Sequence, residues 1–176
     1  MAETFLISDT HFGDLDSLAY TRDDGSLFRP FASVQQMDDL MIENWNKTIK
    51  PDDKVYHLGD VCIHRKDLKV LEKLNGKKCL IRGNHDIFKL KDYSKYFYDV
   101  RGCHCIDKFI FTHLPVHRDS LGDWKNIHGH IHWRRVQFHN FVDPFYYNVC
   151  VECNDFTPIS FEEVKKRMMT QAQFPW

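Results

Sequence analysis

Residues of the kinds that bind metal ions follow five short apolar stretches of this chain. The stretches 5–7, 55–58, 78–81, 109–111 and 126–128 have the character of buried strands, and each gives way to a polar turn. Because ligand sites of open α/β sheets lie at the carboxyl ends of strands, these turns should meet at one edge. The candidate ligands are Asp9, His11, Asp60, Asn84, His113, His130 and His132.

The candidate ligands comprise carboxylates, imidazoles and one amide, without a thiolate. Such oxygen and nitrogen donors suit Mn, Fe, Zn, Co or Ni better than a structural zinc site built from cysteines. Seven ligands are too many for one ion and suit two, with Asp60 as the natural shared carboxylate. Two divalent ions exceed the charge of Asp9 and Asp60, so a phosphate substrate would neutralise the excess.

His85 stands one residue beyond Asn84, which places it beside the predicted ions rather than among their ligands. We expect it to donate a proton to the leaving oxygen or to stabilise charge in the transition state. Asp86 should fix the His85 imidazole by a hydrogen bond. Arg29, in a long loop, could contact a phosphate with two nitrogens. Taken singly, a His or Arg more often has a structural or solvated role, but the strand ends together favour a site.

Length and charge limit the other possibilities. With 176 residues the chain fits one domain, residues 1–176, and can bury a real core. The 24 basic and 25 acidic residues leave a formal charge of -1, which gives no global field for nucleic acid. The start of the sequence has no basic segment followed by an apolar run, so we expect a cytoplasmic protein without a membrane span.

The six cysteines are expected to be reduced thiols, because the chain is larger than most disulfide scaffolds and shows no secretion signal. The pairs Cys103 with Cys105 and Cys150 with Cys153 could be drawn as a zinc site, an alternative that we do not adopt. The cysteines expected to pack as small hydrophobic residues are Cys62, Cys79 and Cys150.

Strand patterns that alternate with helical patterns predict parallel βαβ units. Ser33 can cap a helix, with Gln36 at the position of a capping box and an apolar stripe over 34–45. Apolar residues three apart predict a short helix over 66–74, and a last helix is expected over 160–169. The other expectations are a long loop over 12–31, a helix or lid over 89–98, strands over 4–8, 100–107, 108–112 and 145–151, and a loop over 119–124.

In their order, these motifs resemble those of the calcineurin-like metallophosphoesterase superfamily: Asp9-x-His11, Gly59-Asp60, Gly83-Asn84-His85-Asp86, His113 and Gly129-His130-x-His132. The chain is more closely similar to small stand-alone bacterial and phage phosphoesterases, which share the stretches Arg29-Pro30-Phe31, Trp45-Asn46 and Pro158-Ile159-Ser160. Relatives often follow the first motif with a His and an Asn, whereas this chain has Gly13-Asp14-Leu15. His113 is followed by a variant sequence, Leu114-Pro115-Val116-His117.

The resemblance implies an α/β fold of the four-layer αββα sandwich type that holds two divalent metal ions. It places Asp9, His11, Asp60 and His132 around one ion, and Asp60, Asn84, His113 and His130 around the other. His85 would be the catalytic histidine. Our first hypothesis is phosphoester hydrolysis by a metal-bridging hydroxide, with diesters slightly favoured over monoesters and Mn²⁺ as the expected metal.

We expect the substrate to be a nucleotide or a nucleic-acid end, because a small domain without basic excess does not suit long duplex DNA. Aromatic side chains in the site loops could stack on a base. They are Phe12, Tyr20, Phe28, Tyr93 and Trp133. The alternative is a protein-interaction scaffold that keeps this fold without turnover. His85 argues against it, since a scaffold needs no acid for a leaving group. No obligate protein partner is evident.

Overall fold

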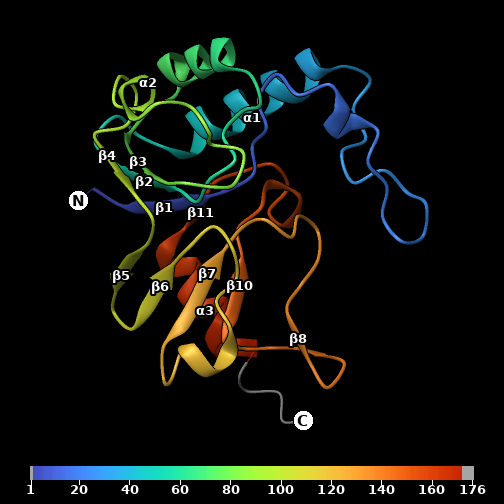
Figure 1. The fold of residues 1–176 in the computed structure, drawn as a ribbon, viewed down its shortest axis with the longest axis vertical. Helices are drawn as coiled ribbons and strands as arrows, with labels where there is room; N and C mark the ends of the chain where they lie inside the picture. Colours follow the sequence, from blue (N-terminus) through green and yellow to red (C-terminus); the bar gives the residue numbers. More distant parts are fainter. Residues whose placement is uncertain (1, 172–176) are drawn as a thin grey trace.

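The structure, a computed structural model, describes residues 2–171. Two β-sheets lie face to face, and helices cover the outer face of the first sheet (Figure 1). Parallel and antiparallel pairings both occur, so the expected α/β fold of stacked sheets and helices is confirmed. One apolar core lies between the helices and the first sheet, and a second lies between the two sheets.

The first sheet has five strands in the order β11-β1-β2-β3-β4. Neighbours from β1 to β4 are parallel, and β11 is antiparallel to β1. Because parallel strands end on the same side, the carboxyl ends of β1, β2 and β3 open onto one edge. The strands are β1 (Thr4–Ile7), β2 (Lys54–His57), β3 (Lys77–Ile81), β4 (Asp99–Arg101) and β11 (Ile159–Ser160).

The second sheet has four strands in the order β10-β7-β6-β5, of which only β5 is antiparallel to its neighbour. Its strands are β5 (His104–Ile106), β6 (Phe109–Phe111), β7 (Lys125–His128) and β10 (Tyr146–Asn148). A parallel bridge between Ser8 and Cys150 joins the sheets. The Ser8 N–H donates to the Val149 carbonyl at 3.0 Å, and the Val151 N–H donates to the Ser8 carbonyl at 3.1 Å. This bridge brings the carboxyl ends of both sheets together.

Helix α1 (Val34–Thr48) begins where the sequence predicts. The Ser33 hydroxyl accepts a hydrogen bond from the Gln36 N–H at 3.1 Å, and the Gln36 side chain accepts one from the Ala32 N–H at 2.9 Å. The first contact satisfies an amide group that the first turn of a helix leaves unpaired, and the second ties the residue before the cap to that turn. The buried side chains of α1, which pack on the first sheet, are Met37, Met41 and Trp45.

The predicted helix over 66–74 is the 3₁₀ helix η2 (Arg65–Lys73). Leu68 and Leu71 in this helix, and Leu74 directly after it, recur every third position, which matches the three residues per turn of a 3₁₀ helix. All three are therefore aligned on one face, and all three are buried in the core over the first sheet.

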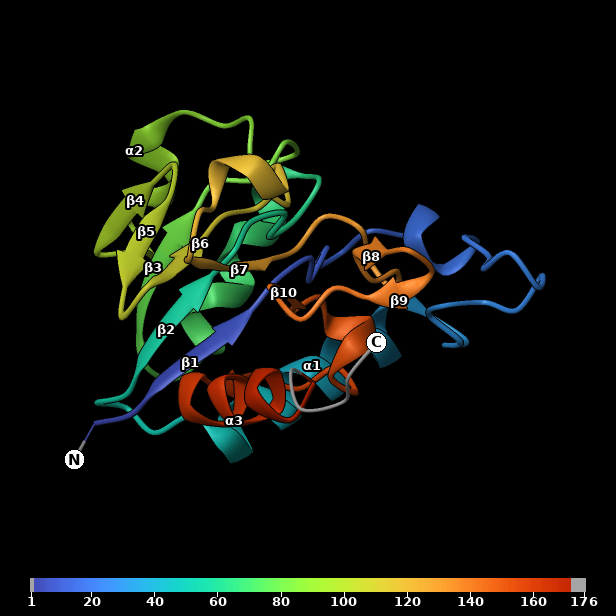
Figure 2. The same ribbon diagram turned by 90° about the horizontal axis from the view of Figure 1, so that it is seen from below.

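The last helix, α3 (Phe161–Gln171), contacts β1, β10 and β11 (Figure 2). Its residues Phe161, Val164 and Met168 enter the core between the sheets. The Ser160 hydroxyl accepts a hydrogen bond from the Glu163 N–H at 3.1 Å, as a helix cap should. The shorter helices are η1 (Asp16–Leu18), α2 (Leu90–Tyr93), η3 (Arg118–Ser120) and η4 (Val151–Cys153).

The stretch 100–107, predicted as one strand, is divided between the sheets as β4 and β5. The exposed Gly102 and Cys103 form the crossing point, and nothing lies within 4 Å of a Cβ placed on Gly102. An unpredicted hairpin, β8 (Gln137–Phe138) and β9 (Phe141–Val142), follows the last histidine motif. This hairpin and the loop 13–30 project on the same side of the molecule (Figures 1 and 2).

The cysteines are free thiols, as predicted, and Cys62, Cys79 and Cys150 are buried. The side-chain groups that could hold a metal ion in the described part of the chain contain no cysteine. The alternative zinc site therefore finds no support. Between residues 2 and 171, no helix is both long and apolar enough to cross a membrane.

Asp38 on α1 should make stability depend on pH. Burial, opposed by a hydrogen bond from the Gly13 N–H and reinforced by Asp67 and Asp39, raises its pKa from 3.8 to about 6. The folded protein thus holds this proton more tightly than the unfolded chain, and stability falls as the pH rises between these values. Asp38→Asn should raise Tm at pH 7.5 by roughly 2–4 °C, the shift that about 1 kcal/mol produces at this size. Thermal unfolding at pH 7.5 and pH 3 checks this, and an equal gain at both would contradict it.

Candidate metal centre

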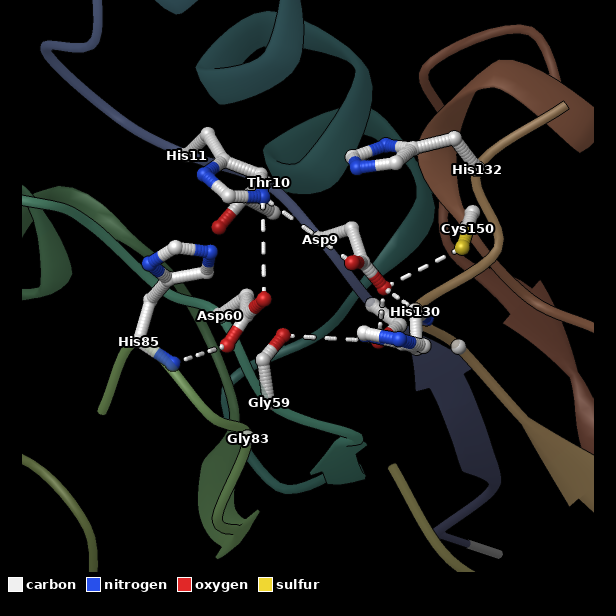
Figure 3. A network of polar contacts seen from close by, with 12 residues as sticks. Asp9, Thr10, His11, Gly59, Asp60, Gly83, His85, His130, His132 and Cys150 are labelled. Carbon is white, nitrogen blue, oxygen red and sulfur yellow. Dashed lines mark hydrogen bonds and ion pairs between the residues drawn. The ribbon is translucent and has the colours of Figure 1, made fainter. Parts of the chain in front are cut away.

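The loops after β1 and β2 remain paired beyond the strands, and they carry the first candidate ligands. The Asp9 N–H donates to the Gly59 carbonyl at 2.9 Å, and the His11 N–H donates to the Asp60 carbonyl at 3.1 Å. This continued pairing holds Asp9 and His11 opposite Asp60 at the carboxyl edge. Figure 3 shows the His11, His85 and His132 rings around the two carboxylates.

Several candidate ligands have a left-handed backbone, which is uncommon for residues other than glycine. Each such residue costs about 1–3 kcal/mol, and such residues cluster at functional sites. The turns direct side chains into one small space that regular strands could not reach. The residues and their φ angles are Asp9 (58°), His11 (48°), Asp60 (56°), His130 (71°) and His132 (50°).

The candidate ligands gather in two groups, each with three side chains whose ligand atoms lie within 4.8 Å of one another. The first group is Asp9, His11 and His132, and the second is Asp60, His113 and His130. These groups come from the loops after β1, β2, β6 and β7, so both sheets contribute. The structure thus brings together six of the seven predicted ligands in the pairing that the resemblance implies.

Unsatisfied atoms of the first group fit a metal ion. Asp9 Oδ1 and both ring nitrogens of His11 are buried without a hydrogen-bond partner in the described structure. Leaving such a group unpaired costs about 1–3 kcal/mol. His11 Nε2 lies 3.9 Å from Asp9 Oδ1, too far for a hydrogen bond. The separation suits two bonds of about 2.1 Å that meet at one ion.

Asp60 faces both groups. Its Oδ2 atom lies 3.8 Å from His11 Nε2 and 3.3 Å from His113 Nε2. Burial, the largest influence, raises the pKa of Asp60, but His113 outweighs it and leaves the pKa below its usual value. An ionised carboxylate between two ligand groups is suited to a bridging position.

The seventh predicted ligand, Asn84, adjoins the second group, with Oδ1 2.8 Å from His113 Nε2. His113 Nδ1 donates to the Leu58 carbonyl at 2.7 Å, which leaves Nε2 directed at the site. Burial lowers the pKa of His113, but hydrogen bonding to Asp60 and the charge of Asp9 raise it to about 9 in the metal-free protein. A metal ion at Nε2 would therefore displace a proton.

The Asp9 carboxylate is held on one side only. Its Oδ2 accepts hydrogen bonds from the Ser8 hydroxyl at 2.6 Å, the His130 N–H at 2.8 Å and the Cys150 thiol at 3.1 Å. Burial raises the pKa of Asp9, but the imidazoles of His11, His113 and His132 hold it well below its usual range. Fixing Oδ2 aims the free Oδ1 at the ligand group.

Gly129 is required by the close approach of the β7 loop to Asp9. A Cβ at this position would overlap Ser8 Oγ and Asp9 Oδ2. Gly129→Ala should therefore destabilise the protein by about 1–3 kcal/mol and weaken metal binding at the first group. Thermal unfolding and metal titration check this, with Gly102→Ala as the control because that Cβ meets no atom within 4 Å. Wild-type metal affinity in Gly129→Ala would contradict the expectation.

Asp86 does not hold the His85 imidazole, which corrects the sequence prediction. Its carboxylate is buried and accepts backbone hydrogen bonds from Asp60 at 2.8 Å, Gly83 at 2.8 Å and Val61 at 3.2 Å. Burial raises its pKa, against the effect of these amides. An Asp three residues after a glycine turn can fold back on its own backbone, and this one ties the loops after β2 and β3 together.

His85 lies at the edge of the site with its side chain exposed. Its backbone N–H donates to Asp60 Oδ1 at 2.8 Å, which positions it against the shared carboxylate. The His85 ring centroid is 5.6 Å from that of His11. The imidazole can therefore reach a group bound over the ligands, as a leaving-group acid must.

Arg29 cannot contact a substrate as predicted, because it is fully buried. Its Nε donates to Glu152 Oε1 at 2.7 Å, and its other nitrogens donate to the carbonyls of Thr10 and Asp9. An arginine in a loop is usually solvated. Arg29 is instead buried, where it pairs with a carboxylate 123 residues away in the sequence. Sequence reasoning missed Glu152, since no spacing in the sequence marks it as a partner.

His57, which is outside the ligand set as predicted, is buried and forms hydrogen bonds with the loops after β1 and β2. Its Nδ1 accepts from the Gly59 N–H at 3.2 Å, so Nε2 carries the proton and donates to Thr10 Oγ1 at 3.0 Å. Burial lowers the pKa of His57 to about 3, which keeps the ring neutral. The other histidines outside both ligand groups and the His85 position are His64, His104, His117, His128 and His139.

Two groups of carboxylate and imidazole ligands at the shared edge of two stacked sheets are the features of a metal-dependent phosphoesterase. Residues 4–158 match the family model of calcineurin-like phosphoesterases, and the chain belongs to this family. The family is one of hydrolases, so the predicted resemblance and the assignment as an enzyme are confirmed.

Similar proteins match most of this chain. An uncharacterized protein of Methanocaldococcus jannaschii is 34% identical over 177 residues, which cover 94% of this chain and 91% of that protein. The crystal structure of a protein of unknown function from Aquifex aeolicus superposes with a TM-score of 0.67 at 26% identity, covering 95% and 100% of the two chains. Vacuolar protein sorting 29 from Cryptosporidium parvum gives a TM-score of 0.42 at 18% identity, covering 84% and 72%.

Proposed function

We propose that this phosphoesterase hydrolyses phosphodiesters with two divalent ions, and that Mn²⁺ supports the activity in vitro. The observation that carries the proposal is the Asp60 carboxylate, which faces both ligand groups. Asp9, His11, Asp60 and His132 would hold one ion, and Asp60, Asn84, His113 and His130 would hold the other. When bound, such a pair of ions polarises phosphoryl oxygens and activates water for attack.

His85 is the proposed proton donor to the leaving oxygen. Its exposed imidazole adjoins His11, and its backbone is fixed by Asp60 Oδ1. A donor beside the ligands, rather than among them, can keep its proton while the ions are bound. An alkoxide that leaves from the phosphorus would take that proton and depart as a neutral alcohol.

The burial of Arg29 supports a diester over a monoester. A monoester carries one more negative charge on its phosphate than a diester, and an arginine clamp commonly binds such a charge. Arg29 is instead paired with Glu152 inside the protein. The exposed side chain beside the ligand groups, that of His85, is an imidazole rather than a guanidinium.

A stack of rings next to the site supports a substrate with a nucleobase. Phe28 packs on His132 with ring centroids 5.3 Å apart, and Tyr20 stacks on Phe28 at 5.8 Å. Tyr20 is 50% exposed, so one part of its ring is open to a ligand. Phe12 and Tyr93, also predicted to stack on a base, are fully buried and cannot do so.

The first experiment compares an aryl phosphodiester with the matching monoester on Mn²⁺-loaded protein. We expect turnover of the diester to exceed that of the monoester, and chelation of the metal to abolish both. A preference for the monoester would contradict the diester assignment. Absence of turnover for both, with two ions shown to be bound, would contradict the proposed diester hydrolysis and favour a scaffold.

A second experiment tests the nucleobase with two nitrophenyl diesters that share the leaving group. One carries a nucleoside and the other a methyl group. Stacking of a base on an aromatic ring contributes about 1–3 kcal/mol to binding. Tyr20→Ala removes the ring and should therefore raise KM for the nucleoside ester alone. Tyr98→Ala is the control, because Tyr98 is 59% exposed and belongs to no ligand loop. Equal KM values for wild type and Tyr20→Ala would contradict a role for this ring.

A further inference from the structure

One buried ion pair contacts two ligands of the same predicted ion. Glu152 Oε1 lies 2.6 Å from one terminal nitrogen of Arg29, and His132 Nδ1 lies 3.1 Å from the same oxygen. Arg29 also donates to the backbone carbonyls of Asp9 and Thr10. The guanidinium and carboxylate therefore link the loop of Asp9 to His132, which is more than 120 residues away in the chain.

The charges on this pair fit a role in orienting ligands. With Nδ1 held by Glu152, the neutral His132 ring carries its proton there and leaves Nε2 free for an ion. The Glu152 carboxylate is paired with the Arg29 guanidinium on one side and contacts the imidazole on the other, so it can strengthen the donor character of that imidazole.

Within residues 2–171, no arginine–glutamate pair contacts the histidines of the second ligand group. His113 Nδ1 donates to a backbone carbonyl, that of Leu58, rather than to a carboxylate. The backbone carbonyl provides orientation with no added negative charge. The two groups therefore differ in how their histidines are supported.

We propose that Arg29 and Glu152 act as positioning residues for the ion of Asp9, His11 and His132, and have no comparable effect on the other ion. This inference rests on the proposed two-metal function. Neither residue touches the substrate in this account. Glu152 acts through the His132 ring, and Arg29 acts through Glu152 and the two carbonyls.

The test measures Mn²⁺ binding to metal-free variants by equilibrium dialysis. Glu152→Gln keeps the shape of the side chain and removes its charge. Loss of an outer-shell partner typically weakens metal affinity about 10–100-fold, and we expect this for one of the two ions. Because one unpaired charge can destabilise a buried site, the double variant Arg29→Met with Glu152→Gln is measured beside it. The control pair, Arg167→Met with Glu163→Gln, removes an exposed Arg-Glu contact of 2.8 Å on α3.

Two further backgrounds decide which ion is affected. In His113→Ala, where the first group alone should retain its ion, adding Glu152→Gln should weaken that remaining ion. In His11→Ala, adding Glu152→Gln should change nothing. Equal weakening in both backgrounds would show a general structural effect and overturn the proposal, as would wild-type affinities in Glu152→Gln and in the double variant. Failure of the proposed function itself is distinguishable, because wild type would then bind fewer than two ions or show no turnover.

Discussion

The His85→Ala protein is expected to bind both ions as wild type does and yet to turn over a phosphodiester with an alkyl leaving group about 10²–10⁴-fold more slowly, the usual contribution of a general acid. The expectation follows from the position of His85. Its backbone N–H meets Asp60 Oδ1, but its exposed ring belongs to neither ligand group. Removing the ring should leave the ligands in place and take away only the proton donor. Steady-state kcat at saturating Mn²⁺ is the measurement.

The matched control is His117→Ala. The side chain of His117 is 77% exposed, and its Nδ1 accepts a hydrogen bond from the Asp119 N–H at 3.3 Å. His117 follows the fourth motif. The substitution His117→Ala therefore removes an imidazole from the loop after His113 without changing a candidate ligand. If His85→Ala retained the kcat of wild type, or lost metal to the same extent as kcat, the role as proton donor would be wrong.

The Asp60→Asn protein is expected to lose affinity for both ions together. A single carboxylate oxygen, Oδ2, lies near both ligand groups, and an amide has neither the charge of the carboxylate nor two equivalent donor atoms. The loss should exceed the about 10–100-fold that removal of an outer-shell partner causes. His11→Ala should weaken mainly one ion, because only the first group contains it.

Metal titration followed by thermal unfolding distinguishes these outcomes. Asp52→Asn is the control for the substitution, because its carboxylate is 88% exposed and contacts only Lys77 at the surface. Equal retention of metal in Asp60→Asn and His11→Ala would rule out the shared carboxylate. A loss of one ion in each variant would place Asp60 in a single site.

The gathering of the candidate ligands at one edge could be predicted from the sequence because it follows from parallel pairing. Asp9, Asp60 and His113 each come within two or three residues of a strand end, and parallel strands must deliver such ends to one edge. The last helix and the helix cap at Ser33 could also be predicted, because they depend on local contacts. A capping contact joins residues only three apart in the sequence. Such features require no knowledge of how distant segments meet.

Distant partners explain where the predictions went wrong. Arg29 was expected to bind a phosphate, but it is buried in an ion pair with Glu152. This contact depends on how the second sheet packs on the first. Asp86 was expected to hold an imidazole, but it closes on the amides of its own turn and of the β2 loop. A side chain that suits two partners is assigned by tertiary geometry, which residue type and spacing do not contain.

The crossing at Gly102 shows the same limit for the backbone. Residues on both sides of it have strand character, so a continuous strand over 100–107 was the natural prediction. The chain instead leaves the first sheet after Arg101 and enters the second at His104. Which sheet each half joins is decided by the partners available, β3 for one and β6 for the other.

The central claim is that two ions held at the shared edge of the sheets carry out phosphoester hydrolysis. The most direct measurement adds Mn²⁺ stepwise to metal-free protein and records bound ions and diester turnover at each step. The account predicts two ions per chain, with turnover rising as the second ion binds. Full turnover with a single ion, or turnover that persists after complete removal of metal, would contradict it.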